Sequence, residues 1–249
     1  MTEAPFHGWI GRSVPRREDP PLLRGEGRYS ADAEPPETLH LAIRRAGIPH
    51  GSGLAVDLAP ALAMPGVAGA WRAGELGLAD DFMPDATPQP PPIRRPIIAS
   101  GAVRFEGDAV AVVAAETEYQ AHDAVDAIGV DLAEAAPARD PIGVQRFTAG
   151  DPATAFAGAP VTVRERLRMG RICGAAIEPR AVLAEWREAE QQVWVRATTG
   201  GVHVLRDALC HCLGLERNQV VVVSDDVGGS FGAKNNPYPE YIVAAAVSR

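Results

Sequence analysis

The fold is decided by residues 220–234, which read VVVVSDDVGGSFGAK. Four consecutive valines are typical of a strand buried on both faces, because β-branched residues favour extended backbone and an unbroken apolar run favours burial. A glycine-rich turn follows at residues 228–232. Beyond Pro237, an Ala-rich segment predicts a helix over residues 238–247, with Pro239 in its first turn. The expected order is therefore strand, glycine loop, helix.

The glycine loop is a candidate ligand site. Glycine permits positive φ angles and has no Cβ, so backbone N–H groups can come close to an anionic or oxo ligand. The spacing matches neither a P-loop nor the G-x-G-x-x-G pattern of dinucleotide sites. A tight connection that binds nothing is the more common role of such a turn, so both interpretations stand. The candidate residues are Gly228, Gly229, Ser230, Phe231 and Gly232.

A second glycine turn lies about thirty residues earlier in the chain. Residues 180–186 and 192–198 predict a β-hairpin. Gly200 and Gly201 follow, and a helix is expected over residues 202–213. If the strands before the two turns are neighbours, the turns converge on one ligand.

The composition excludes several classes of partner. The formal net charge of the 249 residues is −8, which argues against nucleic acid and anionic membranes. No apolar run approaches the roughly 18 residues of a membrane-spanning helix, and the first ten residues lack the pattern of a secretory signal. Three cysteines suit a reducing compartment, so the expected localisation is cytoplasmic. The length suggests two domains.

The clearest periodic unit is a strand, a helix and a second extended segment. Residues 109–115 are apolar and predict a buried strand. Thr117 and Gln120 form a capping box for a helix that continues to about Ile128. Residues 130–132 then predict an extended segment, and the whole reads as a β-α-β element of an α/β domain.

Other segments are less regular. Glycines, prolines and charges between residues 6 and 33 predict an extended arm that wraps around something. The proline-rich residues 84–96 predict a stiff surface loop, and residues 133–148 a linker. Residues 161–167 read as a strand. Shorter elements are expected as strands at 39–43 and 67–71 and a helix from Asp57 to Ala63.

Four polar clusters have plainer interpretations than catalysis. Cys-His-Cys at residues 210–212 resembles a metal set, but neighbours one and two apart on a helix do not face one ion. Cys173 has no histidine nearby and reads as a structural thiol. Glu178 and Arg180 predict a structural ion pair. The adjacent aspartates at residues 225–226 point in opposite directions in extended chain. No catalytic residue and no metal ligand is assigned here.

Five short motifs, spread in order over most of the chain, carry a resemblance to a known family. They are Arg-Glu-Asp-Pro at 17–20, Leu-Arg-Gly-Glu-Gly-Arg-Tyr at 23–29, Gly-Asp-Ala-Val-Ala at 107–111, Ile-Glu-Pro-Arg-Ala at 177–181 and Asp-Val-Gly-Gly-Ser-Phe-Gly-Ala-Lys at 226–234. Together they resemble the molybdenum hydroxylase large subunit, the family of xanthine dehydrogenase, aldehyde oxidase and carbon monoxide dehydrogenase.

The resemblance implies an α/β (α+β) fold in which an a/b hammerhead domain precedes the first part of a molybdopterin-binding domain. Residues 1–19 would form an N-terminal arm and residues 20–135 the hammerhead domain. Residues 136–148 would be a linker, and residues 149–249 the start of an incomplete molybdopterin-binding domain.

The resemblance also implies an oxidoreductase that hydroxylates an aldehyde, an N-heterocycle or carbon monoxide with oxygen derived from water. The loop from Gly228 to Gly232 would lie against the molybdenum centre, with Gly200 and Gly201 in the other cofactor-side turn. The implied cofactor is molybdenum–molybdopterin in its cytosine dinucleotide form. The implied partners are the remaining part of the molybdopterin subunit, an iron–sulfur subunit, an FAD subunit and a small-molecule substrate. The catalytic base would come from outside these residues.

Three departures from the family pattern leave alternatives open. Gly200 stands where the family has a glutamine that hydrogen-bonds a molybdenum ligand, and Ser230 replaces a third glycine. Residues 107–109 read Gly-Asp-Ala where Gly-Glu-Pro is typical. The chain is then one part of a split subunit, a part of a longer enzyme, or a non-catalytic relative that serves as a binding or assembly module. Without a partner it is expected to expose apolar surface and to associate.

Overall fold

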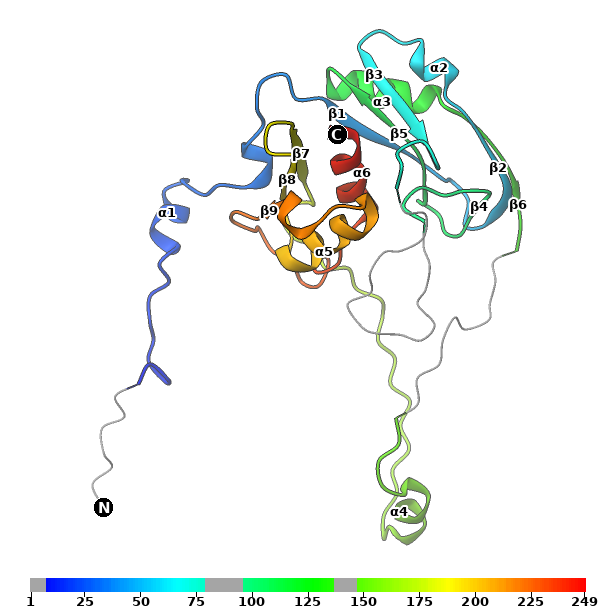
Figure 1. The fold of residues 1–249 in the computed structure, drawn as a ribbon. Helices are drawn as coiled ribbons and strands as arrows, with labels where there is room; N and C mark the ends of the chain where they lie inside the picture. The colour runs from blue at the N-terminus through cyan, green and yellow to red at the C-terminus, as the bar shows by residue number, and fades with distance from the viewer. Residues whose placement is uncertain (1–7, 79–95, 137–146) are drawn as a thin grey trace.

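The computed structural model describes residues 8–78, 96–136 and 147–249, in which sheets and helices form one main body with two projecting segments (Figure 1). Most of the loop predicted over residues 84–96 and most of the linker predicted over residues 136–148 lie outside the described residues. Among the described helices, none is long and apolar enough to cross a membrane. In chain order the elements are α1 (Asp19–Leu23), η1 (Ser30–Asp32), β1 (His40–Arg45), β2 (Gly51–Asp57), α2 (Ala59–Leu62), β3 (Val67–Arg72), β4 (Ala102–Val103), β5 (Ala109–Ala115), α3 (Glu118–Ala127), β6 (Gly129–Glu134), α4 (Pro152–Gly158), β7 (Val182–Arg187), β8 (Gln192–Ala197), α5 (Val202–Leu213), η2 (Arg217–Gln219), β9 (Val220–Val223) and α6 (Pro239–Ser248).

Two three-stranded antiparallel sheets form the N-terminal half. The first has the order β1-β5-β3, and the second has the order β4-β2-β6. Every residue of β5 is buried, because the strand lies between two partners and against α3. The buried strand predicted at residues 109–115 is confirmed. The strands predicted at residues 39–43 and 67–71 are present as β1 and β3.

Helix α3 begins as its sequence predicts. The Thr117 hydroxyl oxygen accepts a hydrogen bond from the N–H of Gln120 at 3.3 Å, and the hydroxyl itself donates to Gln120 Oε1 at 2.9 Å. Ala121, Ala124 and Val125 form its buried face. The predicted β-α-β pairing is wrong, because β5 and β6 belong to different sheets. Both edges of β5 are already taken by β1 and β3, so β6 pairs with β2.

The C-terminal half is a three-stranded sheet with the order β7-β8-β9. Strands β7 and β8 form the predicted antiparallel hairpin, and β9 runs parallel to β8 after the crossover through α5. Helix α5 ends at Gly214, whose φ of 64° is the left-handed conformation that favours glycine. Helix α6 follows the glycine loop and starts at Pro239. Both helices predicted for this half are confirmed.

The prediction that residues 220–223 are buried on both faces is wrong for three of the four valines. Val220 is buried, whereas Val221, Val222 and Val223 are partly exposed. Strand β9 has a single neighbour, β8, among the described residues and therefore lies at an edge of its sheet. An apolar run indicates burial from its own composition, but the burial of an edge strand depends on what lies beside it.

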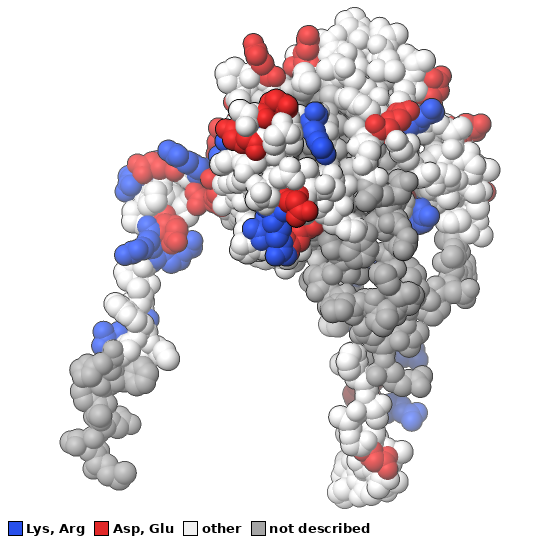
Figure 2. Space-filling view, viewed as in Figure 1, with Lys and Arg blue, Asp and Glu red and all other residues white. Residues whose placement is uncertain are grey.

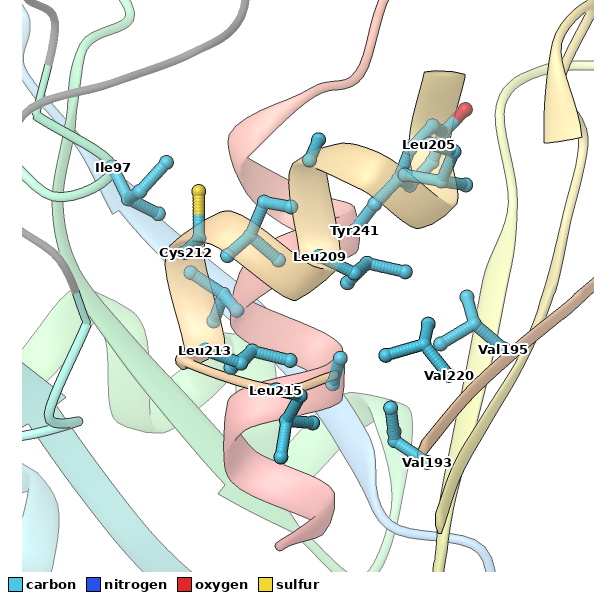
Figure 3. Packing of buried hydrophobic residues seen from close by; sticks show 14 of the residues in the cluster. Ile97, Val193, Val195, Leu205, Leu209, Cys212, Leu213, Leu215, Val220 and Tyr241 are labelled. Atoms are coloured by element: carbon cyan, nitrogen blue, oxygen red, sulfur yellow. The ribbon is translucent and has the colours of Figure 1, made fainter. Parts of the chain in front are cut away.

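One hydrophobic core joins the two halves of the chain. Leu205 and Leu209 of α5 and Tyr241 of α6 pack between the helices and the C-terminal sheet (Figure 3). Ile97 and Val112, which come from the N-terminal half, belong to the same cluster. The loops at the end of the C-terminal sheet are thereby held in a fixed position against the N-terminal sheets.

Two segments project from this body on the same side (Figure 1). One contains α1 and is the described part of the arm predicted between residues 6 and 33. The other passes through α4 and returns over residues 159–177. The strand predicted at residues 161–167 is wrong, because that segment pairs with no strand among the described residues and its side chains are exposed.

Candidate functional site

The two glycine turns lie side by side at one edge of the C-terminal sheet. Strands β8 and β9 are parallel, so the turns that follow them leave the sheet at the same edge. The N–H of Gly200 donates to the C=O of Lys234 at 2.9 Å, and the Thr199 hydroxyl donates to the same oxygen at 3.4 Å. The carbonyl of Lys234 therefore holds the second turn against the end of the glycine loop.

The glycine loop has an unusual backbone. Gly229 and Gly232 have φ angles of 101° and 87°, which favour glycine, and Phe231 between them has a φ of 49°. A bulky residue in this left-handed region is strained by about 1–3 kcal/mol. The Phe231 side chain is 77% exposed, so no buried packing compensates the strain. Strain of this kind concentrates at ligand-binding sites.

Four successive amides of this loop are available to a ligand. The N–H groups of Gly229, Ser230, Phe231 and Gly232 donate to no acceptor among the described residues. Successive N–H groups in such turn conformations make concave sites for anions. The arrangement suits an anionic or oxo ligand, as the sequence suggested, although the ligand role itself stays a prediction.

A buried ion pair fixes both ends of the loop. Glu178 Oε2 accepts hydrogen bonds from the N–H of Gly228 at 2.7 Å and from Lys234 Nζ at 2.9 Å. The Lys234 and Glu178 side chains are only 2% and 11% exposed. A Cβ at Gly228 would lie 2.5 Å from the Glu178 Cβ, so this position requires glycine. Because the Lys234 charge is paired with Glu178, the loop amides are the groups left to attract an anion.

The structural ion pair predicted between Glu178 and Arg180 is wrong. The Arg180 guanidinium lies over the Tyr238 ring, 3.7 Å from its centre, in a cation–π contact. The Tyr238 hydroxyl in turn donates to the C=O of Ala233 at 2.7 Å. Arg180 is drawn to the aromatic ring at the start of α6, whereas Glu178 is drawn to the buried Lys234.

The adjacent aspartates before the loop have separate partners. Asp225 pairs with Arg196 of β8. Asp226 Oδ2 accepts a hydrogen bond from the N–H of Arg28 at 2.9 Å, and the N–H of Asp226 donates to the Arg28 C=O at 3.0 Å. These contacts confirm that the two carboxylates do not act as a pair. The contacts of Asp226 also attach the N-terminal arm to the residues just before the glycine loop.

The three cysteines form no disulfide and differ in their burial. Cys212 points into the core (Figure 3), and burial raises the pKa of its thiol to about 11. Burial is also the main cause that raises the pKa of Cys210. Cys173 is exposed. Among the described residues, no group of three or more His, Cys, Asp and Glu side chains is arranged to hold a metal ion.

A groove of about 700 Å³ lies between the two N-terminal sheets. Its lining includes Asp57, Arg72 and Asp131 but no residue of either glycine turn. Arg72 Nη1 donates to the C=O of Val56 at 2.6 Å, and its Nε donates to Glu75 at 3.0 Å. These contacts stabilise the sheets. The groove is separate from the site that the glycine turns form, because neither turn contributes to its lining.

Sequence reasoning missed three side chains of the site, namely Glu178, Lys234 and Asn235. A buried lysine needs a carboxylate partner, and Lys234 lies two residues after the glycine loop, but its burial became visible only in the structure. The separation of 56 positions between Glu178 and Lys234 hid that partner. Asn235 carried no signal, since its contacts depend on how the two turns meet.

Comparison with known families agrees with this architecture. Residues 24–136 match the family described as "Aldehyde oxidase and xanthine dehydrogenase, a/b hammerhead domain", and residues 136–249 match "Molybdopterin cofactor-binding domain". The chain belongs to the molybdenum hydroxylase large-subunit family. The resemblance carried by the five motifs and the expected fold, a hammerhead domain followed by a molybdopterin-binding region, are confirmed.

Named members of the molybdenum hydroxylase family resemble nearly the whole chain. The nicotine 6-hydroxylase large subunit of Paenarthrobacter nicotinovorans is 29% identical over 96% of the chain. The carbon monoxide dehydrogenase large chain of Hydrogenophaga pseudoflava is 30% identical over 93%. The crystal structure of quinoline 2-oxidoreductase from Pseudomonas putida 86 matches 97% of the chain with a TM-score of 0.80 and 30% identity. The chain spans 32%, 32% and 33% of these proteins, or about a third of each.

The residues present fit one side of a molybdopterin-type hydroxylase site. The loop amides suit an oxo or anionic group. The glycines at positions 228 and 229 let the loop pack closely, since a Cβ there would lie 2.5 Å from the Glu178 Cβ and 2.9 Å from the Phe231 ring, respectively. In the described part of the chain, the carboxylates next to the loop, Glu178, Asp225 and Asp226, are each paired. The described residues of the site therefore offer hydrogen-bond donors for an anionic or oxo ligand.

Proposed function

We propose that this chain forms the cofactor-facing part of a molybdenum hydroxylase that acts on an aldehyde, an N-heterocycle or carbon monoxide. The proposal is carried by the four amides of residues 229–232, which have no acceptor among the described residues. They lie on a strained loop whose end is hydrogen-bonded to Gly200, and Gly201 follows in the same second turn. When bound, the molybdenum–molybdopterin cofactor would supply the redox centre. For an aldehyde or an N-heterocycle, substrate C–H and water give C–OH, two protons and two electrons; for carbon monoxide, CO and water give carbon dioxide, two protons and two electrons.

The residues of this chain bind the cofactor and orient it. The amides of Gly229, Ser230, Phe231 and Gly232 donate to oxo or other anionic atoms on the cofactor, and such preorganised donors stabilise charge as it develops. The Glu178–Lys234 pair holds the loop ends so that these donors keep their positions. The exposed Phe231 ring provides an apolar surface beside the same loop. The catalytic base comes from outside this chain.

We propose further that a second polypeptide completes the site. Residues 161–169 read VTVRERLRM. Apart from Glu165, an apolar residue stands at every second position, and polar residues, three of them arginines, stand between; all are exposed. The segment pairs with no strand among the described residues, as an unpaired strand would. Figure 2 shows that this segment and the N-terminal arm stand clear of the main body. The proposed partners are the remaining molybdopterin part, an iron–sulfur subunit and an FAD subunit, which receive the two electrons. The proposed cofactor form is the cytosine dinucleotide, and the proposed compartment is the cytoplasm.

The test is affinity purification of the tagged chain from its native host, with mass spectrometry and molybdenum analysis of the eluate. Co-purification with a second large-subunit part, iron–sulfur and FAD subunits and near-stoichiometric molybdenum supports the proposal. A folded, metal-free chain recovered alone contradicts it.

A second candidate function is a non-catalytic binding or assembly module of the same fold. Gly200 and Ser230 favour this candidate, because they change the two turns that face the ligand. The two candidates differ in the metal content of the purified complex. A complex with the same partners but without molybdenum would support the module.

A further inference from the structure

The side chain of Asn235 occupies the space that a side chain at position 200, in the second turn, would fill. A Cβ at Gly200 would lie 2.6 Å from Asn235 Oδ1, closer than a carbon and an oxygen approach without a bond. The φ angle of Gly200 is not positive, so its backbone does not demand glycine. A side chain at position 200 would therefore have to displace the Asn235 carboxamide, which occupies that space when residue 200 is glycine.

Ser230 holds Asn235 in this place. The Ser230 hydroxyl donates to Asn235 Oδ1 at 3.1 Å, which leaves the carboxamide NH2 as the outward donor. That NH2 group donates to no acceptor among the described residues, and Asn235 is exposed. Ser230 belongs to the same loop as the available amides, so the donors of Asn235 lie at the edge of the amide cluster.

We propose that Asn235 is a ligand-binding residue. Held by Ser230 in the space left by Gly200, its NH2 group donates to an oxygen of the oxo or oxyanion group that the amides of residues 229–232 bind. The three residues thus act together. Gly200, in the second turn, has no side chain and leaves space for Asn235, which lies beyond the glycine loop, is held by Ser230 and supplies the side-chain donor there. This inference deepens the proposed function and takes from it the identity of the natural ligand.

The test uses the full 249-residue chain and molybdate as the probe. Titration calorimetry measures affinity, and hydrogen exchange localises binding to residues 228–236. Asn235→Ala removes the donor and is expected to weaken binding about tenfold, the usual effect of a lost hydrogen bond to a charged group. Asn235→Asp keeps the shape and adds a negative charge, so a larger loss is expected. Asn236→Asp is the matched control, because it places the same charge on the adjacent exposed asparagine, and it is expected to bind within about twofold of wild type.

A double-mutant cycle tests the shared space. Gly200→Ala places a Cβ against Asn235 Oδ1 and must turn the Asn235 side chain away from Ser230. The expected loss equals that of Asn235→Ala, and the Gly200→Ala/Asn235→Ala double variant should lose no more than either single variant. Additive losses would show that the two positions act separately, and they would overturn the proposal.

The remaining outcomes also decide the matter. Absence of molybdate binding to the wild-type chain, protection elsewhere than residues 228–236, or wild-type affinity in Asn235→Ala would each overturn the role of Asn235. Failure of the proposed function has a different signature. The purified native complex would then lack molybdenum while the isolated chain still binds molybdate through Asn235.

Discussion

Replacement of Lys234 by methionine tests whether the buried ion pair holds the glycine loop in place. Methionine keeps most of the apolar length of the side chain and removes the ammonium group. The Glu178 carboxylate would then stay buried with the N–H of Gly228 as its remaining donor, and its Oε1 already has no partner among the described residues. An uncompensated buried charge of this kind is strongly destabilising.

The expected loss in the free energy of unfolding is about 3–5 kcal/mol. The Lys234 and Glu178 side chains are 2% and 11% exposed, so solvent screens the remaining charge only weakly. The loss is a large share of the roughly 5–15 kcal/mol that stabilises a typical domain. Urea unfolding followed by circular dichroism is the assay, and the midpoint should fall by about 1 M or more.

Two further variants make the comparison decisive. Arg217→Met breaks the Arg217–Asp207 pair, whose side chains are 71% and 45% exposed, and should cost less than about 1 kcal/mol. Glu178→Leu/Lys234→Met removes both charges and should recover much of the stability lost in Lys234→Met. If Lys234→Met costs no more than Arg217→Met, the ion pair does not anchor the loop and the reasoning is refuted.

Four further outcomes are expected. Thr117→Ala removes the cap of α3 and should lower stability by about 1 kcal/mol in the same urea assay, whereas no change would mean that the helix start is held by packing. Burial raises the pKa of Cys212 from 9.0 to about 11, so the folded chain holds this proton more tightly than the unfolded chain. The free energy of unfolding should therefore fall by on the order of 2 kcal/mol as pH rises from 9 to 11. Cys212→Ala should remove that pH dependence. Phe231→Gly relieves the left-handed strain and should raise the melting temperature, equivalent to about 1 kcal/mol, and a lower melting temperature would contradict the backbone argument. Arg164→Glu/Arg166→Glu/Arg168→Glu should reduce recovery of the completing polypeptide in affinity purification at least about tenfold while leaving the circular dichroism spectrum unchanged; undiminished recovery would exclude this segment as its contact.

Local sequence predicted those elements whose determinants lie within a few residues. Helix α3 has its cap and its apolar face in one stretch, and α5 ends at a glycine that supplies the left-handed conformation. The hairpin β7–β8 pairs neighbouring segments. The family motifs then connected these local elements to a known architecture.

The errors concern neighbours that are distant in sequence. Nothing within β5 and β6 indicates that β1 and β3 occupy both edges of β5. The alternation at residues 161–167 is that of a strand, but a strand also needs a partner for its hydrogen bonds. At the site, the glycines were visible in the sequence, whereas the Glu178–Lys234 pair and the Asn235 contact arise only when both turns leave the sheet at one edge.

The backbone contact between Arg28 and Asp226 has a consequence for the timing of synthesis. The two residues are 198 positions apart, so a ribosome that adds about 5–20 residues per second needs roughly 10–40 s between them. During that interval the backbone N–H and C=O of Arg28 lack the partner that Asp226 provides in the folded chain. The segment that leads into the ligand loop is thus completed late, when the arm that was translated 198 positions earlier binds to it.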